Sequence, residues 1–299
     1  MSEALFAAIN ASEGGFVHPS LTLRAISSAA DDRGVFLTAP VDANVTLISV
    51  PYSLVIGPGP DPEGSAASAK DQDKSAPSAW LRTVASLMKA EAALRAAKPD
   101  AAATPERLYL STLPAAYDTL MSWSVEEMDE LRGTGLHASV SSDADGSAFR
   151  SGFEKLRPAL VGLGADDDFE GFRRASQAVV TRGFNCLPPQ SDGVAADSSS
   201  SSSSSPAGPY LIPCVDLLNH SSLSPTSCLT LTSGGAFTVT STVAMRSGEE
   251  VTHPYMKDGC NGDLLRVFGV VEDAPARMTE AELGRGDIVE ACGEVAEEE

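Results

Sequence analysis

The stretch Asp216-Leu217-Leu218-Asn219-His220 decides the fold of this chain. An apolar lead-in, residues 210–215, reads as a buried strand or the end of one. This lead-in stops on Asp, Asn and His, which the packing of a hydrophobic core does not need. The polar side chains are therefore candidates for a binding site, with Asp216 capping the turn that presents Asn219.

A β-hairpin is expected directly after this stretch. Apolar and small residues alternate on both sides of Ser233-Gly234-Gly235: Leu229, Leu231, Phe237, Val239, Ser241 and Val243. The acidic turn 247–250 then redirects the chain, and we interpret Glu249 and Glu250 as surface residues of that turn. Tyr255 follows in a loop before the apolar run 264–271. Residues 210–272 thus predict one wall of a ligand site.

These motifs resemble the second half of a SET methyltransferase domain. The branch they are similar to includes the Rubisco large-subunit lysine methyltransferase and the actin-histidine methyltransferase. The matched positions follow the family's order: Asn219-His220, Gly248-Glu249-Glu250, Tyr255, Asn261 and Phe268-Gly269. The resemblance implies an α+β protein, a SET fold of small β-sheets interrupted by a helical insertion. An unrelated β-hairpin is the alternative, and it would have to match five positions by accident.

The resemblance also divides the chain. Residues 1–57 correspond to the N-terminal part of the SET domain, with an opening helix and strands at 35–37 and 45–50. Residues 58–77 are expected to be a flexible loop, and 78–181 the helical insertion. The C-terminal part of the SET domain covers 182–275 and contains a serine-rich, disordered loop at 191–209. Residues 276–299 form an acidic tail, so the C-terminal substrate-binding domain of the relatives is expected to be absent.

Four helices are predicted within the insertion, and their apolar stripes are interpreted as core packing. The stripes are Leu81, Val84, Met88 and Leu94 in the first helix, Phe149, Phe153, Leu156 and Leu160 in the third, and Phe169, Phe172 and Val179 in the fourth. Ser124 and Glu127 form a capping box for the short second helix, which extends through Leu131. The fourth helix ends at Thr181-Arg182.

The resemblance implies S-adenosyl-L-methionine as the cofactor and Tyr255 as the catalytic residue. A tyrosine hydroxyl can orient the acceptor nitrogen and the methyl group, and Tyr255 would also border the cofactor. On the residues alone, Tyr255 would be a loop residue packed on a sheet edge. Phe268 lies where relatives often have Tyr, in the substrate channel. Our hypothesis is that the missing hydroxyl widens this channel and changes how many methyl groups are added.

Five further positions are implied to bind the cofactor. Arg182 would hold the donor's carboxylate with its planar guanidinium, although a helix C-terminus also attracts arginine. Asn219 would donate its amide to the donor's amino-acid part, or else serve as a structural cap. The main chain of His220 would read the adenine edge. Arg33 and Gly34 belong to a turn that approaches the donor in the relatives.

That turn departs from the family pattern. Relatives have the sequence E-G-x-G, whereas Asp32 stands here in place of the first glycine and Gly34 in place of the second. A side chain at residue 32 crowds the ligand and takes positive φ less freely than glycine. Weaker binding of the donor is the expected consequence. His253, close to Tyr255, is expected to be a solvated histidine.

The composition of the chain limits the kinds of partner that it is expected to bind. The formal net charge of −20 argues against binding to nucleic acid or to anionic membranes, which reward a basic surface. No apolar run approaches the ~20 residues of a membrane span, and the first residues lack a targeting signature. Five cysteines without C-x-x-C spacing favour reduced thiols in the cytoplasm or nucleus, and no metal site is expected. A monomer is expected.

The expected function is methyl transfer from S-adenosyl-L-methionine to a lysine of a protein substrate. Two alternatives stay open at this point. In the first, the acceptor is a histidine. In the second, the chain is a catalytically degenerate SET module that acts as a protein-interaction scaffold. The substitution at Asp32, the absent C-terminal domain and the serine-rich loop favour the second alternative.

Overall fold

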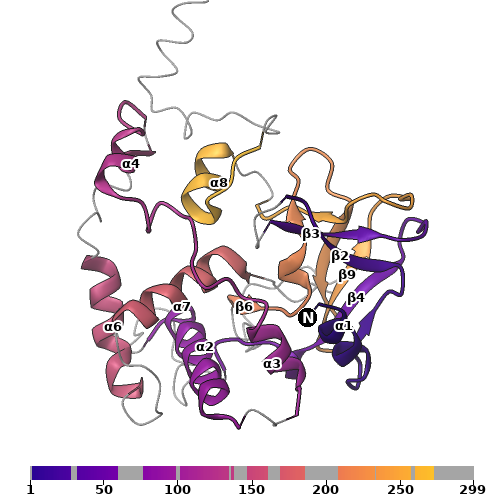
Figure 1. The fold of residues 1–299 in the computed structure, drawn as a ribbon, viewed down its shortest axis with the longest axis horizontal. Helices are drawn as coiled ribbons and strands as arrows, with labels where there is room; N and C mark the ends of the chain where they lie inside the picture. Colours follow the sequence, from indigo (N-terminus) through magenta and orange to yellow (C-terminus); the bar gives the residue numbers. More distant parts are fainter. Residues whose placement is uncertain are drawn as a thin grey trace, which may run out of the picture.

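A computed structural model describes residues 2–27, 32–59, 77–98, 102–134, 136–137, 147–160, 169–185, 208–232, 234–256 and 260–272. The strands gather on one side of the molecule together with the first helix, and most of the longer helices gather on the other (Figure 1). The expected serine-rich loop and acidic tail lie almost entirely outside the described residues, as does most of the loop predicted at 58–77.

The largest sheet combines strands from residues 16–51 with strands from residues 227–241. Its order is β1 (Phe16–Val17), β4 (Thr46–Pro51), β9 (Ala236–Ser241) and β8 (Ser227–Leu231), with every pair antiparallel. The predicted hairpin is confirmed, because Leu229 pairs with Val239 and Leu231 with Phe237. Val243 was wrongly included in the alternation, since it follows β9 and is 47% exposed.

Three two-stranded sheets surround this one. β2 (Leu21–Ala25) pairs with β3 (Arg33–Leu37), and β5 (Gly183–Phe184) pairs with β6 (Tyr210–Leu211). The third sheet brings two motifs together, because β7 (Asn219–His220) lies parallel to β10 (Thr252–His253).

The strand predicted over residues 210–215 is shorter than expected. It stops at Leu211, and a 3₁₀ turn, η2 (Val215–Leu217), follows. Two residues explain the early stop. Pro213 has no N–H to donate to a strand ladder, and Cys214 adopts a positive φ of 69° that turns the chain.

The helices are α1 (Ser2–Asn10), α2 (Ala79–Ala96), α3 (Pro105–Leu110), α4 (Val125–Asp129), α6 (Ser147–Leu160), α7 (Phe169–Arg182) and α8 (Asn261–Phe268), with a 3₁₀ turn η1 (Tyr52–Leu54). The capping box of α4 is confirmed, because both of its hydrogen bonds with Glu127 are present. α3 was not predicted, although its signals are local: the Thr104 side chain accepts from the Arg107 amide, and Pro105 occupies the first turn.

One hydrophobic core runs from α1 through the large sheet into α2 and α7. Leu81, Val84 and Met88 of α2 are buried in it, so the apolar stripe of this helix packs in the core as predicted. In the same helical part, the rings of Phe153, Phe169 and Phe172 lie within 6.4 Å of one another. Among the described helices, none has the length and hydropathy that a membrane crossing requires.

Candidate active site

A cavity of about 690 Å³ lies where the sheets meet the helical part of the chain. Its walls come from segments far apart in the sequence: Arg33, 117–119, 180–185, Asp216, Leu217, Asn219, 229–231, 253–256, Val267, Phe268 and Val270. Five of the predicted site residues are among them: Arg33, Arg182, Asn219, Tyr255 and Phe268. Gly34 and His220, also predicted to bind the cofactor, are not among the residues that line it.

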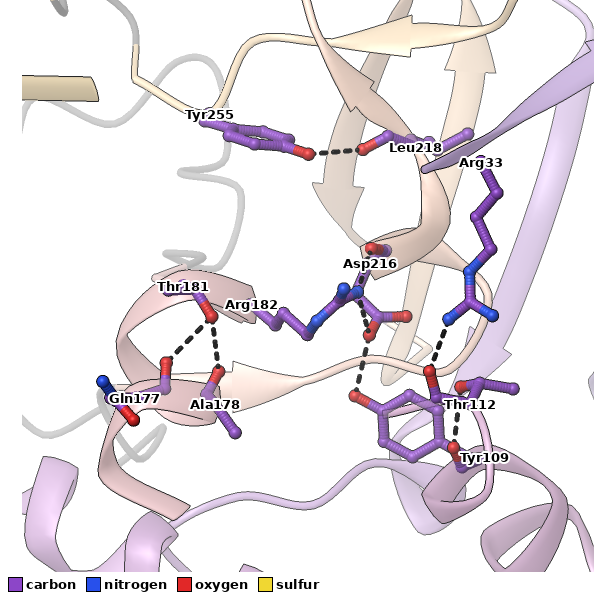
Figure 2. A network of polar contacts seen from close by, with 10 residues as sticks. All are labelled: Arg33, Tyr109, Thr112, Gln177, Ala178, Thr181, Arg182, Asp216, Leu218 and Tyr255. Carbon is purple, nitrogen blue, oxygen red and sulfur yellow. Dashed lines mark hydrogen bonds and ion pairs between the residues drawn. The ribbon is translucent and has the colours of Figure 1, made fainter. Parts of the chain in front are cut away.

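Tyr255 is held at both ends. Its hydroxyl donates to the carbonyl of Leu218 at 3.0 Å, and its backbone amide donates to Nδ1 of His220 at 3.0 Å (Figure 2 shows the first bond). Burial raises the pKa of Tyr255 to about 12, an effect that Asp216 and Glu250 increase and that Arg182 opposes. The phenol is therefore protonated at neutral pH, so it can orient a reactant by hydrogen bonding but does not act as a general base.

Arg182 is the last residue of α7 and reaches across to η2 (Figure 2). Its Nη1 donates to the Asp216 carbonyl at 2.9 Å and forms an ion pair with Oδ2 of the same residue at 3.3 Å. Tyr109, from α3, also donates to Oδ2, at 3.2 Å. Nε of Arg182 is buried and has no hydrogen-bond partner within the described part of the chain.

This arrangement corrects the role predicted for Asp216. Its side chain is fully buried and pairs with Arg182 and Tyr109, so it does not act as a simple turn cap. Burial raises the pKa of the Asp216 carboxyl, while the neighbouring Arg182 works against this rise. Oδ1 of Asp216 lacks a hydrogen-bond partner among the described residues. A charged pair with unused polar atoms therefore forms part of the cavity wall.

Asn219 joins three segments. Its Nδ2 donates to the Arg33 carbonyl at 3.0 Å and to Oε1 of Glu250 at 2.7 Å. Glu250 is thus half-buried beside the site, and its interpretation as a surface turn residue was wrong. A Cβ added to Gly34 would lie 2.1 Å from Glu250 Oε1 and 2.9 Å from Asn219 Nδ2. Gly34 thus leaves space for the Asn219–Glu250 contact, and its role is steric because its φ is not in the left-handed region.

Arg33, the first residue of β3, contacts the helical part of the chain. Nη2 of Arg33 donates to the carbonyl of Thr112, which ties β3 to the segment that follows α3 (Figure 2). Asp32 does not line the cavity, and its carbonyl accepts the amide of Ile26 at 2.9 Å. The expected effect of Asp32 on donor affinity stays a prediction.

His253 is not the solvated histidine that was expected. It is 9% exposed, and its ring lies 5.7 Å from the ring of Phe184. It lies in β10, paired with β7, and is among the residues that line the cavity. Burial, together with the nearby His220, lowers the pKa of His253 to about 4. The imidazole is therefore neutral at physiological pH.

Sequence reasoning missed the contribution of residues 117–119. Tyr117 lines the cavity, and its buried hydroxyl has no hydrogen-bond partner among the described residues. Burial raises the pKa of Tyr117 to about 12. This segment lies between α3 and α4 and has no helical or strand periodicity, so the sequence carries no signal that would have placed it at the site.

The cavity has the volume and the charged lining of a site for a small organic ligand. No group of three or more His, Cys, Asp or Glu side chains in the described ranges could hold a metal ion. The cavity volume lies in the range of small-molecule pockets, about 300–1,000 Å³. Nε of Arg182, which is buried and without a hydrogen-bond partner in the described ranges, is a donor suited to a carboxylate, and Asn219 lines the same cavity. These groups fit the amino-acid part of a methyl donor.

The architecture is the SET fold: several small sheets, a helical segment between the two halves of the strands, and the Asn219 and Tyr255 motifs side by side in β7 and after β10. The SET domain of LSMT bound to lysine and AdoHcy superimposes with a TM-score of 0.64 and 19% sequence identity, covering 91% of this chain and 57% of that one. Rubisco LSMT bound to AdoMet gives the same TM-score and identity, with 91% and 56% covered.

A curated relative agrees with this assignment. The chain is 27% identical over 182 residues to the chloroplastic [fructose-bisphosphate aldolase]-lysine N-methyltransferase of Arabidopsis thaliana. That match covers 57% of this chain but only 34% of the relative, so the chain spans about a third of that protein's length. No family model matches the chain. The predicted fold and the resemblance to this branch of methyltransferases are confirmed.

Proposed function

We propose that this chain is an S-adenosyl-L-methionine-dependent protein-lysine N-methyltransferase. The observation that carries the proposal is the convergence of Arg182, Asn219 and Tyr255 on one cavity of about 690 Å³. The Arabidopsis relative is a lysine methyltransferase by name, and solved structures of LSMT hold lysine and AdoHcy in one case and AdoMet in another. Both facts support a lysine acceptor.

In this proposal the donor supplies a methyl group carried on a sulfonium. Arg182 holds the carboxylate of its amino-acid part. Asn219 offers its Oδ1 to the donor's ammonium group, because its amide hydrogens already bind the Arg33 carbonyl and Glu250. Arg33 also lines the cavity. The protonated Tyr255 hydroxyl orients the acceptor nitrogen beside the carbonyl of Leu218. Holding the two reactants in line is the main contribution of the chain, because methyl transfer requires a short, aligned approach.

The acceptor must reach the site as a neutral amine. Two carboxylates are among the described residues that line this cavity: Asp216 is paired with Arg182, and Asp118 accepts the indole N–H of Trp123 at 3.0 Å. The cationic guanidinium and the burial of the site both lower the pKa of a lysine that enters. A lysine side chain thus loses its proton to solvent as it is buried, and the chain needs no dedicated base.

The test is transfer of a radiolabelled methyl group to proteins of a cell extract, with calorimetry of donor binding in parallel. We expect label on lysine, and we expect Tyr255→Phe to reduce kcat by about 100-fold while donor affinity changes little. Label on histidine would instead indicate a protein-histidine N-methyltransferase. Absence of donor binding and of transfer would exclude the enzyme and favour the scaffold.

We also propose that the protein is a monomer of the cytoplasm or nucleus. The scattered spacing of its five cysteines supports a reducing compartment. Size-exclusion chromatography with light scattering tests the oligomeric state. Imaging of the tagged, full-length protein tests the compartment, and the chloroplast, named for the Arabidopsis relative, is the competing outcome.

A further inference from the structure

His220 is tied to Tyr255 through its side chain, away from the cavity. Nδ1 of His220 accepts the backbone N–H of Tyr255 at 3.0 Å, and the two rings lie 5.1 Å apart. Because Nδ1 is an acceptor, the neutral imidazole carries its proton on Nε2. Nε2 is buried and has no hydrogen-bond partner within the described residues. The carboxylate facing it is Glu272, whose Oε2 lies 3.6 Å away.

Glu272 is itself held rigidly. The Ser222 amide donates to its Oε1 at 2.9 Å, and the Ser222 hydroxyl donates to its Oε2. Its backbone N–H and carbonyl both bind the side chain of Asn261, at 2.8 and 2.9 Å. Partial burial raises the pKa of Glu272, but the hydrogen bonds from Ser222 outweigh this effect and hold the pKa below its ordinary value. The carboxylate is therefore ionised and fixed beside His220.

We propose that Glu272 is a positioning residue for Tyr255 and acts through His220, so that Tyr255 is held in place only while His220 is neutral. This inference rests on the proposed function. Protonation of His220 places an N–H on both ring nitrogens, and Nδ1 then faces the Tyr255 amide as donor against donor. The imidazolium would be stabilised by Glu272, while the backbone of Tyr255 would lose its acceptor.

Among the described residues, the charged or titratable side chains that face His220 are Glu272 beyond α8, His253 on β10 and Tyr255 after it. Burial lowers the pKa of His220, and Glu272 opposes that shift. His220 is therefore neutral at physiological pH and becomes protonated as the pH falls. We call this coupling of Glu272, His220 and Tyr255 the relay. It predicts that kcat decreases at low pH as His220 becomes protonated, which gives the pH profile an acid limb.

The main test replaces Glu272 by Gln, which keeps the shape and removes the charge. We expect kcat for methyl transfer to fall by about tenfold with KM for the donor changed less than about twofold. The acid limb should move to lower pH, because the carboxylate that raises the pKa of His220 is gone. Glu126→Gln, at a carboxylate on α4, is the matched control and should behave like the wild type.

A second pair of variants separates positioning from packing. His220→Asn can still present an oxygen to the Tyr255 amide, whereas His220→Leu cannot. We expect His220→Asn to retain more activity than His220→Leu and to lack the acid limb. Adding Glu272→Gln to His220→Asn should then have little further effect. Equal loss in both His220 variants, or an unmoved acid limb in folded Glu272→Gln, would overturn the proposal.

An independent readout keeps the inference distinct from the proposed function. Nitrogen chemical shifts of the His220 ring report its protonation without any substrate, and Glu272→Ala, which also removes the charge, serves if Glu272→Gln does not fold. A lowered His220 pKa in either variant supports the relay even if the wild type transfers no methyl group. If the wild type transfers methyl groups but neither variant changes the titration of His220, the relay is refuted and the proposed function stands.

Discussion

Phe268 packs its ring against Tyr255, with the ring centroids 4.8 Å apart, and both residues line the cavity. Phe268 fills space beside the catalytic candidate but offers no polar atom to the acceptor nitrogen. A tyrosine at this position would add a hydroxyl to the same wall, which would narrow the cavity and supply another hydrogen-bond acceptor.

We therefore expect Phe268→Tyr to shift the products toward fewer methyl groups per lysine. Each methyl group added to the lysine nitrogen needs space in the cavity and replaces one N–H. The new hydroxyl would occupy that space. Mass spectrometry of the methylated acceptor at matched turnover measures the distribution. If wild type and variant yield the same proportions of methylated forms, the hypothesis about this channel fails.

His253 makes a second prediction, on stability and pH. Its pKa falls from an ordinary 6.5 to about 4 in the folded chain, because burial disfavours the imidazolium. The unfolded chain thus binds more protons between these two values, so the free energy of unfolding decreases as the pH falls from 6.5 to 4. The loss reaches about 3 kcal/mol at the acid end of this window.

Urea unfolding at a series of pH values checks this expectation. The variant His253→Gln cannot titrate, so its free energy of unfolding should depend less steeply on pH over the window than that of the wild type. Carboxylates titrate in both proteins, and the difference between the two curves isolates His253. Parallel curves would show that His253 does not contribute.

At the scale of elements, α7 and η2 are joined by one ion pair. Arg182 ends α7, and Asp216 sits in η2 with a side chain that is fully buried. α3 supports the same contact through Tyr109. The helical part of the chain thus positions a cavity-lining arginine, and the contact links it to the strands that carry Asn219 and Tyr255.

Removing one partner leaves an uncompensated buried charge. We expect Asp216→Ala to reduce the free energy of unfolding by about 3 kcal/mol or more. The control is Asp129→Ala, which breaks the ion pair with Arg132. The side chain of Asp129 is 42% exposed and that of Arg132 is 70% exposed. Its effect should stay within about 0.5 kcal/mol. Urea denaturation measures both, and similar losses in the two variants would contradict this account.

At the scale of the whole molecule, the net charge of −20 exerts an electrostatic force on any protein substrate that approaches. An excess of negative charge attracts basic segments over distances set by the Debye length. A lysine flanked by basic residues should therefore be a better acceptor at low ionic strength than the same lysine in a neutral context.

We expect KM for a basic acceptor peptide to rise several-fold from about 0.1 M to about 1 M salt, as the Debye length falls from roughly 10 Å to roughly 3 Å. A peptide with the flanking basic residues replaced by glutamine is the control, and its KM should change little. Initial rates at several salt concentrations measure both. Equal salt dependence of the two peptides would refute long-range attraction.

Several elements could be predicted because their signals are local. The hairpin of β8 and β9 follows from alternation around two glycines, and the start of α4 follows from Ser124 and Glu127, three residues apart. Residues that act over long sequence separations could not be predicted this way. Asp216 was interpreted as a cap because its partners, Arg182 and Tyr109, lie 34 and 107 residues away.

The sequence by itself determined the order of the motifs, the main helices and strands, and the resemblance to SET methyltransferases, since all of these depend on neighbouring residues. Only the tertiary structure decided which side chains share the cavity, that His253 is buried, and that Gly34 makes room for Asn219 and Glu250. The physical reason is that burial and the choice of polar partners depend on where distant segments meet, and spacing along the chain does not encode that meeting point.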